Sequence, residues 1–433
     1  MKLQKLTPRQ IKQLIKDHRE PVWSFLIKVF GTGCTFIFSI LLGRTLGSSA
    51  VGTYSIGSDI LTIALILAKF GLDTALIKFI SIYYHSKYPG DIRRIMKHSA
   101  ATVCLISLIL ITAIFPLAPW LADHLFHMPD LDHLLRFLIF STPFIALLHL
   151  IASFFKGLGN TKLGLFFESA ILPFVSSLFL LLVRLIAGHS DFDLLGLLYL
   201  TAAVCSFLIA GLSFLVRLHS VRHQDSPDYD FKQVLQTAHP LLWVNSTNYI
   251  LSCADTIMLG LWCSSSDVGV YNVATKITLL FSMLLSVVNA LFGPRFALLY
   301  HEGKLTELRQ HLRSISWKMR ALSAGLVLLL ALASPLILSL WGGSFLRGEP
   351  VLLVALVGQF FVLSKGPLAT LLMMCGLEKQ HRNNTLISAA LNILLNACLI
   401  PWLGILGAAI ATSASLVVKN VLTIRVSRRL FTK

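Results

Sequence analysis

The sequence predicts an all-α polytopic membrane protein with about twelve transmembrane helices in two six-helix lobes related by a pseudo-two-fold axis. Three observations predict this fold: a hydrophobic composition, apolar runs of bilayer length, and an internal repeat. Of the 433 residues, 55% are hydrophobic and only 13% are charged. Soluble domains carry about 25% charged residues, so this chain has too few polar groups to cover a globular surface in water. The composition therefore weighs against a soluble enzyme and a disordered scaffold.

The apolar runs recur twelve times along the chain, each near the length of about 20 residues that a transmembrane helix needs. The predicted spans are residues 22–42, 53–70, 98–120, 134–155, 163–187, 194–216, 238–262, 269–292, 319–341, 350–375, 385–401 and 405–424.

The orientation of these spans follows from the Lys and Arg residues of the connections, because cytoplasmic loops are enriched in them. With the N-terminus inside, the inside segments carry 28 Lys and Arg and the outside loops only 2. We therefore predict that residues 1–20, the linker 217–237 and the tail 425–433 are cytoplasmic. The net charge of +17 then mostly reflects topology, and no nucleic-acid partner is expected.

Sites for soluble cofactors are weakly represented. The seven cysteines lie in or at the ends of apolar stretches without a C-x-x-C pair, which favours simple packing roles. The best metal candidate comprises Asp123, His124, His127 and His133 in the loop between the third and fourth spans. Its H-x-x-H spacing is more typical of solvated loop histidines, so we expect no metal site and no cofactor. The chain has no G-x-x-x-x-G-K-[ST] motif and hence no predicted ATPase.

An internal repeat divides the chain into two halves. Residues 40–54 (ILLGRTLGSSAVGTY) and 257–271 (IMLGLWCSSSDVGVY) share eight of fifteen positions at an offset of 217. This offset contains an even number of spans, so the halves have the same orientation. We predict lobes at 21–216 and 238–424, with a substrate site between them near the middle of the bilayer.

Several motifs resemble a known family. The SSxVGxY segments of the repeat, GLGNTK (157–162), RFALLYHEGKLTELR (295–309) and the stretch NILLN–IP–LGILGAAIAT (392–412) are similar to the polysaccharide flippases of the multidrug/oligosaccharidyl-lipid/polysaccharide (MOP) exporter superfamily, the Wzx-type O-antigen flippases above all. The resemblance implies the MOP exporter fold and alternating access in the cytoplasmic membrane of a bacterium. The implied cargo is an undecaprenyl-diphosphate-linked oligosaccharide moved to the outer leaflet, with a polysaccharide polymerase or glycosyltransferases as partners.

Polar residues recur at helical spacing in the first two spans of each half. Because polar groups are costly in lipid, such stripes favour a cavity wall, with helix–helix packing as the alternative. The predicted lining residues are Thr32, Thr35, Thr62, Asn245, Asn248 and Asn272.

The charges within the spans indicate the class of cargo. Seven Lys and Arg residues lie in or at the ends of spans, against three clear acids. A cavity richer in cations suits a diphosphate and repels organic cations. We predict diphosphate contacts at Lys28 and Lys276, which lie within polar stripes, followed by Lys365 and Arg136.

The three acids, Asp59, Glu168 and Asp255, have two interpretations. They are either structural, each paired with a Lys or Arg, or they bind a coupling Na⁺ or H⁺. Pairing is the preferred interpretation, and Asp255 is the better coupling candidate because Asn245, Asn248 and Ser252 share its helix face.

Three alternatives to a flippase stay open. A multidrug extruder of the same superfamily would need a cavity that favours cations. A membrane glycosyltransferase or polymerase is disfavoured by the short outside loops. A scaffold for a polysaccharide assembly complex has no need of buried cations.

Overall fold

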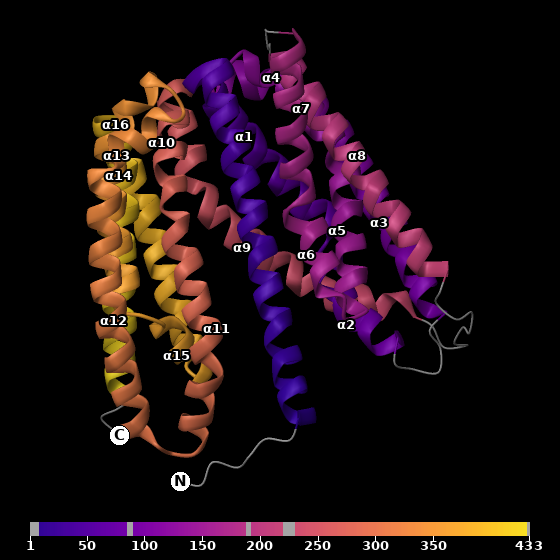
Figure 1. The fold of residues 1–433 in the computed structure, drawn as a ribbon. Coiled ribbons are helices and arrows are strands. Elements are labelled where there is room, and N and C mark those ends of the chain that lie inside the picture. Colours follow the sequence, from indigo (N-terminus) through magenta and orange to yellow (C-terminus); the bar gives the residue numbers. More distant parts are fainter. Residues whose placement is uncertain (1–7, 85–89, 188–191, 220–229, 431–433) are drawn as a thin grey trace. The chain divides into compact units, whose positions relative to one another are not determined.

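The computed structural model describes residues 8–84, 90–187, 192–219 and 230–430, and these residues form helices joined by short connections (Figure 1). Parts of three predicted cytoplasmic segments, residues 1–7, 220–229 and 431–433, lie outside the described residues. The prediction of an all-α fold is confirmed for the described chain. An all-helical fold is expected in lipid, because each helix satisfies its own backbone N–H and C=O groups.

The helices cover the predicted spans, but five spans are each divided between two helices and two pairs of spans are each merged into one helix. Those of the first half are α1 (Pro8–Lys69), α2 (Leu72–Tyr84), α3 (Asp91–Trp120), the π-helical turn η1 (Leu121–Leu125), α4 (Asp130–Phe140), α5 (Thr142–Gly157), α6 (Thr161–Ser169), α7 (Ile171–Ala187) and α8 (Phe192–His219). Those of the second half are α9 (Phe231–Trp262), α10 (Ser265–Ile277), α11 (Leu279–His301), α12 (Leu305–Leu332), α13 (Ser334–Ser339), the 3₁₀ turn η2 (Gly343–Gly348), α14 (Glu349–Ser364), α15 (Leu368–Met374) and α16 (Glu378–Leu430).

Within the described residues, seven helices are long and apolar enough to cross a membrane, or up to nine if each of two bent pairs is one span. The bent pairs are α4 with α5 (42°) and α6 with α7 (44°). Two of the seven, Trp23–Tyr84 and Glu378–Arg428, each contain two of the predicted spans. Their backbones break at glycines with positive φ, 82° at Gly47 and 55° at Gly404, a conformation that side chains with a Cβ disfavour.

The chain divides into two compact units: unit 1 comprises Met1–Thr45 and Gly57–Ile250, and unit 2 comprises Leu46–Ile56 and Leu251–Lys433. The division thus falls inside α9, whereas the sequence placed the lobe boundary in the linker 217–237. The start of α9 belongs to unit 1 because it packs tightly on the turn after α1. A Cβ atom on Gly71 would lie only 2.3 Å from the carbonyl oxygen of Ala238.

Each unit has its own apolar core. In unit 1, α5 packs against α2, α6 and α8, and the rings of Phe154 and Phe214 meet edge to face with centroids 4.8 Å apart. In unit 2, α14 packs between α12 and α16. The two parts of α16 run antiparallel on either side of the break at Gly404, and hydrogen bonds join them. Ser388 Oγ donates to the Ser415 carbonyl (2.7 Å), and Asn392 Nδ2 donates to Thr412 Oγ1 (3.0 Å).

The repeated SSxVGxY segments contact each other within unit 2. Ser48 Oγ lies 2.6 Å from Ser266 Oγ, and Ser49 Oγ lies 2.6 Å from Ser265 Oγ. At the repeat offset, Ser48 corresponds to Ser265 and Ser49 to Ser266, so each serine pairs with the counterpart of its neighbour. This reciprocal pairing is the contact pattern of a two-fold axis passing between the two segments.

The glycines of the two segments follow the same reciprocity. A Cβ atom on Gly52 would lie 1.8 Å from the carbonyl oxygen of Ser265, and one on Gly269 would lie 2.0 Å from that of Ser48. In both cases the obstacle is backbone, which cannot rotate away, so only glycine allows the two helices to cross this closely.

We predict that Gly52→Ala destabilises the protein by about 1–3 kcal/mol, because the added methyl group forces the two segments apart. Thermal unfolding in detergent measures the effect. Gly33→Ala, on the same helix but with open space around the added Cβ, is the control and should be neutral or slightly stabilising. Equal melting temperatures for the two variants would contradict the close crossing.

Candidate functional site

A polar pocket of about 280 Å³ lies inside unit 2, in contrast to the apolar surfaces around it. Helices α9, α10, α14 and α16 line it. Its lining residues are Ser252, Asp255, Thr256, Tyr271, Asn272, Thr275, Lys276, Thr278, Leu279, Ala355, Gln359, Ala409, Thr412, Ser413 and Leu416. The structure therefore brings together three residues predicted from the sequence, Asp255, Asn272 and Lys276.

Asp255 is the most heavily hydrogen-bonded side chain of this pocket. Its Oδ1 accepts a hydrogen bond from Asn396 Nδ2 (2.6 Å). Its Oδ2 accepts from Thr412 Oγ1 (2.6 Å) and from the Tyr271 hydroxyl (3.0 Å). All three donors are neutral, so within the described chain this carboxylate is satisfied by hydrogen bonds and not by a Lys or Arg partner.

The two parts of α16 complete the hydrogen-bond network around Asp255. Asn396 Nδ2 is also 3.2 Å from Asn392 Oδ1, one helical turn earlier. The Oδ1 atom of Asn396 is buried and has no hydrogen-bond partner among the described residues. A buried oxygen without a donor is costly in a protein interior, so the Asn396 amide can accept one further hydrogen bond.

Sequence reasoning missed Asn392 and Asn396 as site residues. The signal was present in the motif NILLN, where two amides four residues apart interrupt an apolar span. Helical periodicity shows that two residues share a face, but it does not show which other helix that face meets.

Lys276 is half-buried on α10, one turn after Asn272. Asn272 Nδ2 donates to the Val268 carbonyl (3.1 Å) and Thr275 Oγ1 to that of Tyr271 (2.9 Å), so these two side chains also satisfy the backbone of their own helix. The pocket therefore offers one ammonium group, one carboxylate, and several hydroxyl and amide groups to a polar ligand.

The other predicted lining residues lie in unit 1. Lys28 is exposed on α1, while Thr32 and Thr35 are half-buried beyond it. Farther along α1, Asp59 accepts a hydrogen bond from the Tyr249 hydroxyl (2.8 Å). Thr62 bonds back to the Ser58 carbonyl (2.8 Å).

Asn245 and Asn248 lie on the part of α9 that belongs to unit 1, and they are half-buried and exposed respectively. The assignment of these side chains to a substrate cavity stays a prediction.

Three other predicted residues are placed outside the pocket. Arg136 Nε donates to Asp132 Oδ1 (2.8 Å) and its guanidinium lies 5.0 Å from the centre of the Phe115 ring. Glu168 forms an ion pair with Lys156, the structural role preferred for it. The backbone carbonyl of Lys365 accepts from Ser316 Oγ (2.9 Å) at the end of α14.

The histidines in η1 and at the start of α4 make local contacts. His124 stacks on Trp120, and His133 Nδ1 lies 3.0 Å from Asp193 Oδ1. Within the described residues, no three His, Cys, Asp or Glu side chains are grouped as a metal ion would require.

Comparison with known proteins gives a family and a fold. A family model described as "Polysaccharide biosynthesis protein" matches residues 19–299. The probable flippase AglR of Haloferax volcanii is 34% identical over 179 residues, which span 40% of this chain but only 37% of that protein. The probable low-salt glycan biosynthesis flippase Agl15 of the same organism is 25% identical over 415 residues, covering 93% of this chain and 82% of that protein.

Two solved structures share the fold. The lipid II flippase MurJ, in an inward closed conformation, matches with a TM-score of 0.70 at 13% identity and covers 94% of this chain and 87% of its own. An inward-facing multidrug resistance MATE family transporter of the MOP superfamily also gives 0.70 at 13% identity, covering 94% and 98%. The prediction of the MOP exporter fold is confirmed, and the fold alone does not separate a lipid flippase from a drug transporter.

We predict that Tyr271→Phe destabilises unit 2 by about 1.5–3 kcal/mol, because it removes one hydrogen bond to a charged group. Tyr300→Phe is the matched control, because Tyr300 is 39% exposed on α11. Removing its hydroxyl group should change the free energy of unfolding by less than about 0.5 kcal/mol. Thermal unfolding of the purified variants measures both. A Tyr271→Phe protein as stable as the control would show that the Asp255 network does not hold these helices together.

Proposed function

Because the chain belongs to the polysaccharide biosynthesis protein family, we propose that it is a flippase that moves a lipid-linked glycan across the membrane by alternating access. The chain has the fold of the MOP transporters, and it is a membrane transporter and not an enzyme. The observation that carries the proposal is the polar pocket of unit 2, which places Lys276 and Asp255 among neutral hydrogen-bonding groups inside an apolar bundle.

The proposed cargo is an undecaprenyl-diphosphate-linked oligosaccharide, moved from the cytoplasmic to the outer leaflet. Hydroxyl and amide side chains suit the sugars, which need hydrogen-bond partners while they cross the bilayer. The ammonium group of Lys276 suits the diphosphate, because charge-assisted hydrogen bonds to phosphate oxygens are about twice as strong as neutral ones. The excess of basic over acidic residues in the spans supports an anionic cargo.

We further propose that the protein lies in the cytoplasmic membrane of a bacterium, with both termini in the cytoplasm. The positive-inside distribution of Lys and Arg supports this orientation. A polysaccharide polymerase and glycosyltransferases are the partners that such a pathway needs, because they consume and supply the lipid-linked repeat unit.

Asp255 is our candidate for the coupling site, with Na⁺ preferred over H⁺. The chemistry of these residues fits a hard cation, which prefers oxygen ligands. The Asp255 carboxylate is hydrogen-bonded to the Thr412 hydroxyl and to the amide of Asn396, and the Oδ1 atom of that amide is unsatisfied. A bound cation would neutralise the carboxylate and satisfy that amide oxygen. Proton coupling at Asp255 is the alternative.

A multidrug extruder of the same fold is the second candidate. The Asp255 carboxylate in the pocket favours it, because a carboxylate attracts an organic cation. Lys276 in the same pocket opposes it, and so does the similarity of nearly the whole chain to a glycan biosynthesis flippase.

We predict that Lys276→Ala lowers transport of the lipid-linked glycan about tenfold or more, since the lost hydrogen bond to a phosphate is worth about 1.5–3 kcal/mol. A strain that lacks the protein is complemented with each variant, and undecaprenyl-diphosphate-linked glycan is quantified in each leaflet. Lys304→Ala, in an exposed connection, controls for the loss of a positive charge. Accumulation in the cytoplasmic leaflet with Lys276→Ala but not with Lys304→Ala is the expected result. Normal transport by Lys276→Ala would remove this lysine from the site.

We predict that Asp255→Asn abolishes the dependence of transport on Na⁺, because the neutral amide keeps the shape of the side chain but loses its charge. Transport into vesicles is measured against Na⁺ concentration at constant pH, and against pH at constant Na⁺. Asp267→Asn is the control and should keep the Na⁺ dependence. Asp267 lies in the first turn of α10, where its Oδ2 accepts a hydrogen bond from Ser264 Oγ (2.7 Å). Transport by the wild type that responds to pH and not to Na⁺ would favour the proton instead.

A further inference from the structure

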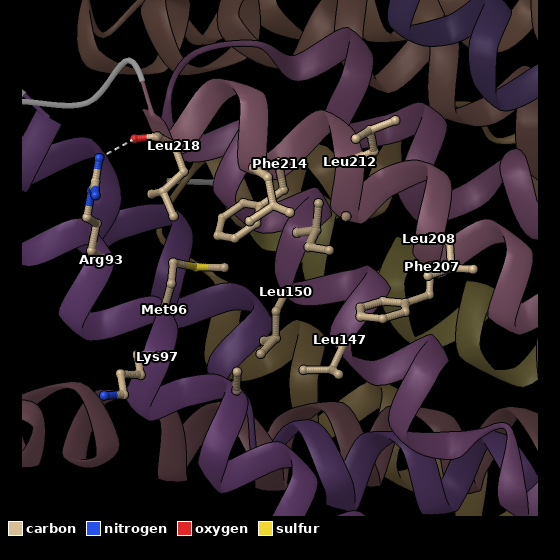
Figure 2. Close-up of a pocket in the computed structure, with 14 residues that line it drawn as sticks. Arg93, Met96, Lys97, Leu147, Leu150, Phe207, Leu208, Leu212, Phe214 and Leu218 are labelled. Carbon is tan, nitrogen blue, oxygen red and sulfur yellow. Dashed lines mark hydrogen bonds between the residues drawn. The ribbon is translucent and has the colours of Figure 1, made fainter.

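An apolar groove of about 570 Å³ lies in unit 1 between α3, α5 and α8. Figure 2 shows its side chains: Leu147 and Leu150 project from α5, and Phe207, Leu212 and Phe214 from α8. The α8 wall opens to the surface, because Leu208, Leu212 and Leu215 are at least 60% exposed. The groove is therefore accessible from the lipid that surrounds unit 1.

Two basic residues stand at one end of this groove. Arg93 and Lys97 lie four residues apart on α3, on one face of the helix, and Figure 2 shows both at the end opposite Phe207 and Leu208. The Nη2 atom of Arg93 donates to the Leu218 carbonyl at the end of α8 (3.0 Å), which ties the guanidinium to that end of the groove. Lys97 is exposed and forms no ion pair with a carboxylate of the described chain.

The distribution of Lys and Arg predicts that the charged end of the groove is the cytoplasmic end. The first turns of α3 follow a connection that the distribution of Lys and Arg places inside, and α8 ends at the cytoplasmic linker. The two cations therefore lie at the level of the inner-leaflet headgroups, where anionic lipids are attracted by clustered Lys and Arg and basic pockets between helices hold their head groups.

The lining excludes the glycan cargo as the natural occupant. Apart from Arg93 and Lys97, every residue that lines the groove is apolar or glycine. Sugars would lose their hydrogen bonds to water without replacement there. A lipid acyl chain gains little free energy when it moves from the bilayer into an apolar groove, because both surroundings are apolar. Selectivity for one lipid must therefore come from the contact of its headgroup with the two cations.

We propose that this groove binds an anionic phospholipid of the inner leaflet, with its phosphate between Arg93 and Lys97 and one acyl chain along α5 and α8. The site is separate from the polar pocket of unit 2 and does not depend on the flippase assignment. Its occupant joins α3, α5 and α8, so it is a structural lipid of unit 1.

The test uses the full-length protein purified in detergent with equal amounts of phosphatidylglycerol and phosphatidylcholine, and native mass spectrometry counts the lipids retained. We expect one tightly retained phosphatidylglycerol. Lys97→Ala should lower its retention about fivefold, the effect of removing one cation near the membrane surface. Lys78→Ala, on α2 and outside the groove, is the matched control and should retain the lipid.

A second variant tests the groove independently of charge. A Cβ atom on Gly211 meets no atom within 4 Å, so Gly211→Leu fills the groove without displacing the backbone. It should release the lipid, while Gly325→Leu, on α12 with equally open surroundings, should not.

Three results would overturn the proposal. Equal retention of phosphatidylcholine would remove the role of the cations, and equal losses with Lys97→Ala and Lys78→Ala would indicate only diffuse attraction. Displacement of phosphatidylglycerol by an equal concentration of undecaprenyl phosphate would assign the groove to the polyprenyl chain of the cargo.

Discussion

Asp255 places a carboxylate inside a helical bundle that lies in lipid, and the architecture of unit 2 is organised around the need to satisfy it. Its hydrogen bonds come from Tyr271 on α10 and from Asn396 and Thr412 on the two parts of α16. A charge within a span is costly unless it faces partners or a cavity, so these helices are held in one arrangement by a single side chain of α9. The break at Gly404 is what allows both parts of α16 to reach it.

A few small and hydroxyl-bearing side chains likewise determine the crossing of the two SSxVGxY segments. Small side chains let helices approach closely, and hydroxyl groups then pair across the contact. Because the two segments repeat one sequence, the same contact forms twice at this crossing: Ser48 pairs with Ser266, and Ser49 pairs with Ser265. The first copy thereby belongs to unit 2 although its flanking helix belongs to unit 1. The two copies of the repeated segment therefore pack against each other through equivalent residues.

The sequence predicted the helices and their approximate limits, because apolar length and backbone hydrogen bonding leave few choices in lipid. The MOP fold was predicted only from the resemblance of several motifs to that superfamily. The sequence placed Asp255, Asn272 and Lys276 on polar stripes of two consecutive spans, and the three residues line one pocket of unit 2. It did not predict the role of Asn396, since periodicity within α16 does not show that its face meets α9. The unit boundary inside α9 was not predictable either, because it depends on how closely Ala238 packs on Gly71. The pairing of Arg136 with Asp132, four residues apart on α4, could have been predicted from spacing alone.

Reconstitution tests directly whether the polar interior of this transporter carries a lipid-linked glycan. The purified protein is inserted into vesicles that contain undecaprenyl-diphosphate-linked oligosaccharide in one leaflet. Accessibility to a membrane-impermeant glycosidase reports the glycan that reaches the opposite leaflet, and uptake of an organic cation is followed in the same vesicles. We expect glycan transfer that requires the protein, with no transport of the organic cation. Transport of the organic cation without glycan transfer would contradict it.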